Sequence, residues 1–215
     1  HIARQLHGKP DPTPYFYVCN CSTSAGLYDM DLMRDEWGPT VSVFGSFQDY
    51  SIYYQDKMLE AGMKGVYNDN TFFVANYDWV TGDAWIDEKG EVQPSFQLWA
   101  NREFARREIV SQIERGIRRP WLTIHHTNAL ILPTMSFASN TMGMEWKYGT
   151  EDFQDRWPPD YVRTVNQGIQ CGVYPTSLEG IFGWKTPEER IRLTRTMLAV
   201  LLLHDHGSRF DIGKE

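Results

Sequence analysis

Short apolar runs alternate along this chain with segments of helical pattern, and each apolar run ends in small polar residues. Of all features of the sequence, this alternation constrains the fold most. The run Gly65–Tyr67 leads into Asn68–Thr71, and the run Pro120–Ile124 leads into His125–Asn128. Strands separated by helices favour β-α-β units, because a parallel neighbour can be reached only through a crossover connection. The sequence therefore predicts an α/β fold with a parallel sheet.

Two long segments have the spacing of amphipathic helices. We expect helices over Ser46–Ala61, with Ser46 or Asp49 as the N-cap, and over Phe96–Arg115. Each segment is followed by a glycine, which commonly ends a helix. The first and second helices would therefore flank the run Gly65–Tyr67.

A third helix has the clearest start signal in the chain. Thr186 suits the N-cap, Pro187 the first helical position, and Glu189 stands three residues after the cap. We expect this helix to stop near Gly207. The apolar residues expected to point inward are Ile191, Leu198, Leu201 and Leu202.

The remaining elements are shorter. The pattern predicts strands over Tyr15–Cys19, Val41–Phe44 and Thr134–Ala138, a hairpin turn over Asp87–Glu91, a short helix over Tyr161–Gln170, and mixed strand and loop over Val173–Ile181.

The composition is that of a globular protein with an acidic surface. Apolar residues make up 41% and charged residues 23% of the chain, which excludes wholesale disorder. The net charge of −7 has the wrong sign for a general binder of nucleic acid or anionic membranes. The longest apolar run, Met197–Leu203, is too short to span a bilayer. We therefore expect no nucleic-acid partner and no membrane partner.

Cofactor and metal signatures are weak. The chain holds 3 cysteines, too few for a disulfide framework or a four-cysteine zinc site, and it has no glycine-rich nucleotide-binding motif. The pair His204 and His206 could share a cation, but it falls where a helix is expected to end and a histidine there can serve the helix terminus. We therefore expect no cofactor and no resident metal.

Two carboxylates stand where functional groups of parallel sheets gather, at the carboxyl ends of strands. Asp69 follows the strand at Val66, and Glu145 follows the segment Thr134–Ala138. Cleavage of a glycosidic bond needs one carboxyl group to protonate the leaving oxygen and a second to attack or to activate water. Each carboxylate also has a purely structural alternative to a catalytic role. Asp69 could close the strand as an Asx-turn residue, and Glu145 could be a solvated loop carboxylate.

Polar and aromatic residues around these carboxylates suit the binding of a sugar. The candidates for substrate binding are Tyr67, Asn70, His125, His126, Asn128 and Trp146. Because neighbours in a strand point to opposite faces, only one of His125 and His126 can face the site. The insertion Phe72–Pro94 would roof it.

Four short motifs carry a resemblance to a known family. Gly65–Thr71, Arg102–Arg107, His125–Asn128 and the stretch from Ser136 to Glu145 resemble a bacterial glycoside-hydrolase-like (β/α)8-barrel family, over roughly residues 40 to 205. This family is similar to retaining hexosaminidase and α-galactosidase-type barrels. The resemblance implies a secreted or periplasmic protein.

The resemblance also implies roles for the two carboxylates and a fold. Asp69 becomes the nucleophile, or the holder of an acetamido group that attacks in its place, and Glu145 becomes the acid/base. A Glu stands here where the family usually has Asp. A whole barrel has about 250 residues, whereas this chain has 215 and begins at His1. We therefore expect one domain over residues 1–215 that forms the middle and C-terminal part of a TIM-type barrel, with its N-terminal strands missing.

The expected function is that of a retaining O-glycoside hydrolase acting on an oligo- or polysaccharide. A non-catalytic carbohydrate-binding barrel is the first alternative. A metal-dependent hydrolase that uses His125 or His126 together with His206 is the second.

Overall fold

A computed structural model gives the fold of the chain. It describes residues 27–31, 36–39, 43–68, 71, 75–80, 83–126, 130–146, 152–165, 172–180 and 186–211. For some strand residues, Trp146 among them, the backbone alone is described. The predicted strand Tyr15–Cys19 lies outside these residues.

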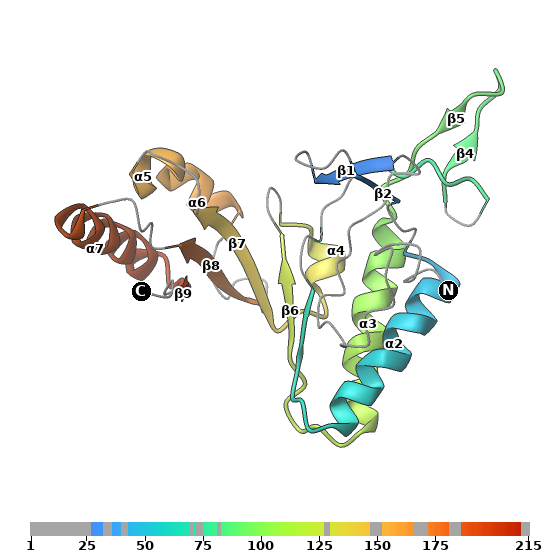
Figure 1. The fold of residues 1–215 in the computed structure, drawn as a ribbon, viewed down its shortest axis with the longest axis horizontal. Helices are drawn as coiled ribbons and strands as arrows, with labels where there is room; N and C mark the ends of the chain where they lie inside the picture. The colour runs from blue at the N-terminus through green and yellow to red at the C-terminus, as the bar shows by residue number, and fades with distance from the viewer. Residues whose placement is uncertain are drawn as a thin grey trace.

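A five-stranded parallel sheet organises the molecule (Figure 1). Its strands are β3 (Val66–Asn68), β6 (Leu122–His125), β7 (Asn140–Trp146), β8 (Tyr174–Gly180) and β9 (Gly207–Asp211). They follow one another across the sheet in chain order, and each neighbouring pair is parallel. All carboxyl ends therefore lie at one edge of the sheet.

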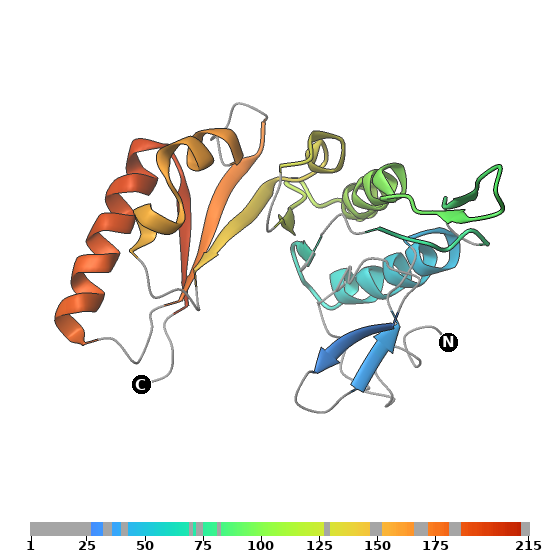
Figure 2. The same cartoon turned by 90° about the horizontal axis from the view of Figure 1, so that it is seen from above.

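Helices precede and connect the strands of this sheet. Helix α2 (Gly45–Glu60) comes before β3. The connections between successive strands hold α3 (Leu98–Glu114), α4 (Leu132–Met135), α5 (Phe153–Arg156), α6 (Pro159–Val165) and α7 (Pro187–Leu203). Seen from above, α2 and α3 lie at one end of the row of strands and α7 lies at the other (Figure 2). Sequential parallel strands with right-handed crossovers keep their helices on one face of a sheet.

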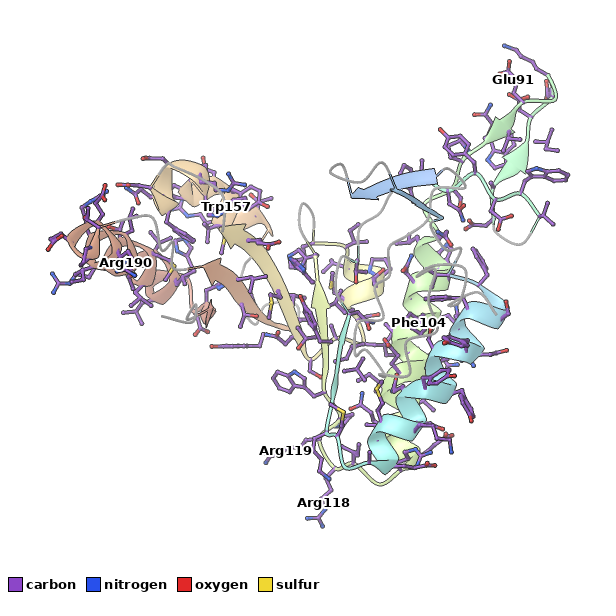
Figure 3. The ribbon with its side chains drawn as sticks, viewed as in Figure 1. Glu91, Phe104, Arg118, Arg119, Trp157 and Arg190 are labelled. Atoms are coloured by element: carbon purple, nitrogen blue, oxygen red, sulfur yellow. The ribbon has the colours of Figure 1, made fainter. Side chains whose placement is uncertain are left out.

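Two small antiparallel hairpins lie outside the sheet. One pairs β1 (Leu27–Asp31) with β2 (Glu36–Pro39), and the other pairs β4 (Trp85–Ile86) with β5 (Val92–Gln93). The second hairpin sits in the long connection between β3 and α3. It extends away from the sheet as an arm with Glu91 near its tip (Figure 3).

The core of the described residues has three parts. Two lie between helices and strands of the sheet, and one lies between two helices. Val66, Leu122 and Ile124 pack with Ala105 of α3 and Met135 of α4. Across the molecule, α5, α6 and α7 pack around Met144 of β7, burying Phe153, Val162, Leu193, Met197 and Leu201. A smaller cluster joins α2 to α3, where the rings of Phe47 and Phe104 meet edge to face at 5.8 Å between centroids (Figure 3).

The long helices confirm the sequence prediction, whereas one predicted strand is wrong. The helices expected over Ser46–Ala61 and Phe96–Arg115 are α2 and α3. Thr134–Ala138, predicted as a strand, instead supplies the end of α4 and the turn after it. Pro133 at the second position of that turn favours a helix start over a strand, because it has no N–H to give to a sheet.

Smaller corrections concern the helix termini and faces. The N-cap of α2 is Phe44, so Ser46 and Asp49 lie inside the helix, and Val43 and Phe44 precede it rather than form a strand. In α7 the capping box of Thr186 and Glu189 is present. The inward residues of α7 are Leu193, Met197 and Leu201, whereas Ile191, Leu198 and Leu202 are exposed.

The strands of the sheet follow chain order and run parallel, and closure of this sheet into a (β/α)8 barrel stays a prediction. Among the described residues, no helix combines the length and the apolar character needed to cross a membrane.

Candidate functional site

Three neighbouring strands bring a tyrosine, a histidine and a carboxylate together near the carboxyl edge of the sheet. Tyr67 comes from β3, His125 from the end of β6 and Glu145 from β7. The rings of Tyr67 and His125 are stacked, with 6.3 Å between centroids and 20° between planes. His125 Nε2 lies 3.8 Å from Glu145 Oε2. The three side chains therefore lie next to one another across three neighbouring strands.

Strand alternation places His125 on the face of the sheet opposite to the helices. Its neighbours Leu122 and Ile124 pack against α3 and α4, so Thr123 and His125 point the other way. His125 is only 2% exposed, whereas the Glu145 side chain is 28% exposed. The histidine is thus a fixed element of the site and the carboxylate is its accessible part.

An irregularity in β7 brings Glu145 to this face. Met142 pairs with His125 and therefore shares its face, so regular alternation would put Met144 there as well and Glu145 on the helix face. The register between β7 and β8 shifts between Gly143 and Trp146, and Met144 has a left-handed φ of 48°. Met144 consequently packs among α5, α6 and α7, and Glu145 meets His125.

His126 lies on the other side of β6 from His125. It is 2% exposed, and its main-chain N–H donates to the carbonyl of Met142 at 2.8 Å. A Cβ at Gly143 would stand 3.1 Å from His126 Nε2. Gly143 thus leaves room for the imidazole beside β7, and a role of His126 in substrate binding stays a prediction.

Four predicted site residues have no described side chain. Asp69, Asn70 and Asn128 lie outside the described residues, and for Trp146 only the backbone, paired with Glu179, is described. The residues that flank Asp69 and Asn70 are described. Asn68 pairs with Ile124 of β6, and the N–H of Thr71 donates to the carbonyl of His125 at 2.9 Å. Both ends of this segment are therefore attached beside His125.

A buried carboxyl group behind β3 was missed in the sequence analysis. Glu108 of α3 is fully buried, and its Oε2 accepts a hydrogen bond of 2.7 Å from Asn68 Nδ2. Burial raises the pKa of Glu108 to about 8, although the hydrogen bond from Asn68 acts in the opposite direction. The helical spacing from Phe104 and Ala105 to position 108 could have revealed that this residue faces the sheet.

The histidines do not assemble into a metal centre in the described part of the chain. No group of three or more His, Cys, Asp or Glu side chains there could hold a metal ion. His206 precedes β9, and its Nδ1 lies 2.7 Å from the carbonyl of Gly207. Three strand spacings, about 14 Å, separate β9 from β6, so His206 is not brought to His125.

Comparisons with protein-family models, with curated proteins and with solved structures found no match.

Proposed function

We propose that the protein is a retaining O-glycoside hydrolase that acts on an oligo- or polysaccharide, with Asp69 as nucleophile and Glu145 as acid/base. The observation that supports this most is the bulge in β7. It turns Glu145 of β7 away from the helices and toward His125 of the neighbouring strand β6. Asn68 and Thr71, which flank Asp69, also contact β6. A carboxylate that served only as a surface charge would not need a left-handed residue beside it.

The proposed chemistry uses the two carboxyl groups in turn. Asp69 attacks the anomeric carbon while Glu145 protonates the departing oxygen, and Glu145 then removes a proton from the water that releases the sugar. An acid/base must be reached by both the leaving group and water, and the partial exposure of Glu145 permits this. His125 orients the carboxylate from a buried position.

The remaining groups would bind the sugar and shape the site. Tyr67, Asn70, His125 and Asn128 would hydrogen-bond to hydroxyl groups, and Trp146 would stack on an apolar sugar face. The five parallel strands would be part of a (β/α)8 barrel, in which active sites lie at the carboxyl ends of the strands.

A screen with chromogenic aryl glycosides tests this proposal on the wild type beside two variants. Asp69→Asn should abolish turnover without changing the thermal unfolding midpoint, because it removes the nucleophile and keeps the shape. Glu145→Gln should lose most activity toward poor leaving groups and keep much of it toward an activated aryl group, which needs no protonation. An active Asp69→Asn variant would rule out the assignment of the nucleophile.

A carbohydrate-binding protein without catalysis is the second candidate. It is favoured by exposed indoles in the connection from β3 to α3 and at the start of α3, since Trp79, Trp85 and Trp99 are 54%, 56% and 66% exposed and aromatic faces stack on sugars. Affinity electrophoresis in polysaccharide-containing gels separates the two functions. Retardation without turnover of any glycoside would favour the binding protein.

A further inference from the structure

Glu108 is an ionisable side chain at a place where an apolar side chain would cost less to bury. It is fully buried on α3, with Phe104 and Ala105 as core neighbours one turn away. Its main-chain carbonyl accepts hydrogen bonds from Gln55 Nε2 at 2.8 Å and Gln112 Nε2 at 3.3 Å. The bond from Gln55 ties α2 to α3 at this residue, whereas the bond from Gln112 lies within α3. A buried carboxyl group costs several kcal/mol when left charged, so its presence calls for a specific partner.

That partner is Asn68, the last residue of β3. Asn68 is 3% exposed, and its side-chain amide donates to Glu108 at 2.7 Å. Its carbonyl accepts from the Thr71 hydroxyl at 3.5 Å, and the Thr71 N–H donates to the carbonyl of His125. A chain of contacts therefore runs from Glu108 through Asn68 and Thr71 to the histidine that faces Glu145.

We propose that Glu108 is a positioning residue that fixes, through Asn68, the end of β3 that precedes Asp69. The inference rests on the proposed function, in which Asp69 is the nucleophile. The group that performs this task is the neutral acid, because burial raises the pKa of Glu108 to about 8. The neutral acid offers a carbonyl oxygen to the Asn68 amide, and glutamine can offer the same oxygen.

Hydrogen exchange at Thr71 tests the proposal without any substrate. Mass spectrometry at pH 7 would follow the peptide that contains Thr71 in the wild type, in Glu108→Gln and in Glu108→Leu. The matched control is Gln112→Leu, which removes another buried amide of α3. Gln112 contacts the main chain of Trp121, at the amino end of β6. Its other hydrogen bond goes to the main-chain carbonyl of Glu108, so its loss leaves the side-chain contact between Glu108 and Asn68 in place.

We expect Glu108→Leu to speed exchange at Thr71 by about 10-fold, the effect of losing one hydrogen bond, since the contact through Asn68 is lost. Glu108→Gln should exchange like the wild type, and Gln112→Leu should leave Thr71 protected while loosening the turn before β6. Equal exchange at Thr71 in Glu108→Leu and the wild type would overturn the proposal. Failure of Glu108→Gln to preserve the protection would overturn it as well.

Asn68→Ala supplies a second test if Glu108→Leu does not fold. It removes the same hydrogen bond from the strand side and leaves only a neutral acid behind, so it should also speed exchange at Thr71. Unchanged exchange in this variant would count against the proposal.

Turnover separates this inference from the proposed function. If the wild type cleaves a glycoside, kcat of Asn68→Ala should fall by about 100-fold while KM changes little, because displacement of a nucleophile by about 1 Å has effects of that size. Kinetics like those of the wild type would overturn the positioning role. A wild type that cleaves no glycoside would instead refute the proposed function, and the exchange experiment would still decide whether Glu108 holds the end of β3.

Discussion

The conformation of one residue, Met144, decides which face of the sheet Glu145 occupies. A left-handed φ in a residue with a side chain costs about 1 to 3 kcal/mol, and here φ is 48°. The cost is offset by the burial of Met144, which is 1% exposed among α5, α6 and α7. The same residue therefore anchors a helix layer and directs the adjacent carboxylate toward His125.

Glu108 gives a prediction at the same scale. Its pKa of about 8 in the folded protein exceeds its ordinary value of 4.5, so the folded state holds a proton that the unfolded state releases. The contribution of Glu108 to the free energy of unfolding should therefore be most favourable below pH 4.5. It should become less favourable as the pH rises from 4.5 to about 8. Glu108→Gln removes this loss.

Urea unfolding at several pH values measures the effect of Glu108→Gln. Between pH 5 and pH 8 the variant should gain stability relative to the wild type by an amount of the order of a few kcal/mol. Glu103→Gln on the exposed side of α3 is the control and should show no such trend, since its carboxylate is paired with Arg106 at the surface. A constant difference between Glu108→Gln and the wild type would contradict the assigned pKa shift.

The helices were predictable from sequence because their signals are local. The Thr186-Pro187 start of α7 and the glycines after α2 and α3 specify where these helices begin or end. Strands β7 and β9 gave no such signal. The sequence of β7, with Asn140, Gly143 and Glu145, lacks the alternation of a half-buried strand, because the bulge reverses its faces. In β9 the pairing with β8 determines the strand.

Part of the geometry of the candidate site could be predicted from the sequence. His125 follows a run of apolar strand residues, so its place near the carboxyl edge could be read from the sequence. Glu145 was singled out, but on the wrong strand, since Thr134–Ala138 forms a helix and turn and β7 carries the carboxylate. Glu108 was missed because a charged residue in a helix is ordinarily read as solvent-facing.

The capping box of α7 provides a prediction for an element. The Thr186 hydroxyl accepts from the N–H of Glu189 at 3.2 Å, and the Glu189 carboxylate accepts from the N–H of Thr186 at 2.9 Å. Thr186→Ala should lower the free energy of unfolding by about 1 kcal/mol. The matched control is Thr196→Ala within the same helix, where the hydroxyl donates to the carbonyl of Arg192.

Thr196→Ala should be neutral or slightly stabilising, because alanine has the higher helix propensity. Chemical denaturation of the two variants beside the wild type gives both values. Equal losses in the two variants would mean that the cap contributes nothing beyond the loss of a threonine.

At the scale of the whole molecule, two buried ionisable groups in different parts of the fold, Glu108 and His206, have opposite effects on how stability depends on pH. His206 lies between α7 and β9, and burial lowers its pKa to about 4 from 6.5, with an opposing hydrogen bond to the carbonyl of Gly207. Between pH 6.5 and about 4 the unfolded state binds a proton that the folded state does not. His206 therefore weakens the fold as the pH falls, whereas Glu108 weakens it as the pH rises.

The two trends overlap between pH 4.5 and 6.5, where they have opposite signs and the same slope per group. The summed contribution of the two groups to the free energy of unfolding should therefore be constant between pH 4.5 and 6.5. It should decrease below pH 4.5 because of His206 and above pH 6.5 because of Glu108. His206→Asn, which keeps an N–H donor near the Gly207 carbonyl, should abolish the loss below pH 6.5 and leave the alkaline loss in place. Glu108→Gln should do the reverse.

Thermal unfolding midpoints from pH 4 to pH 9 would show whether the two groups act independently. Glu108 lies in α3 beside β3, and His206 lies next to β9, and these strands are the two edges of the sheet. Because the two groups are far apart, the double variant should show the sum of the single effects. An acid loss that persists in His206→Asn would mean that another group governs the low-pH limb. A midpoint that depends on pH in the double variant as steeply as in the wild type would show that neither buried group controls the stability of this fold.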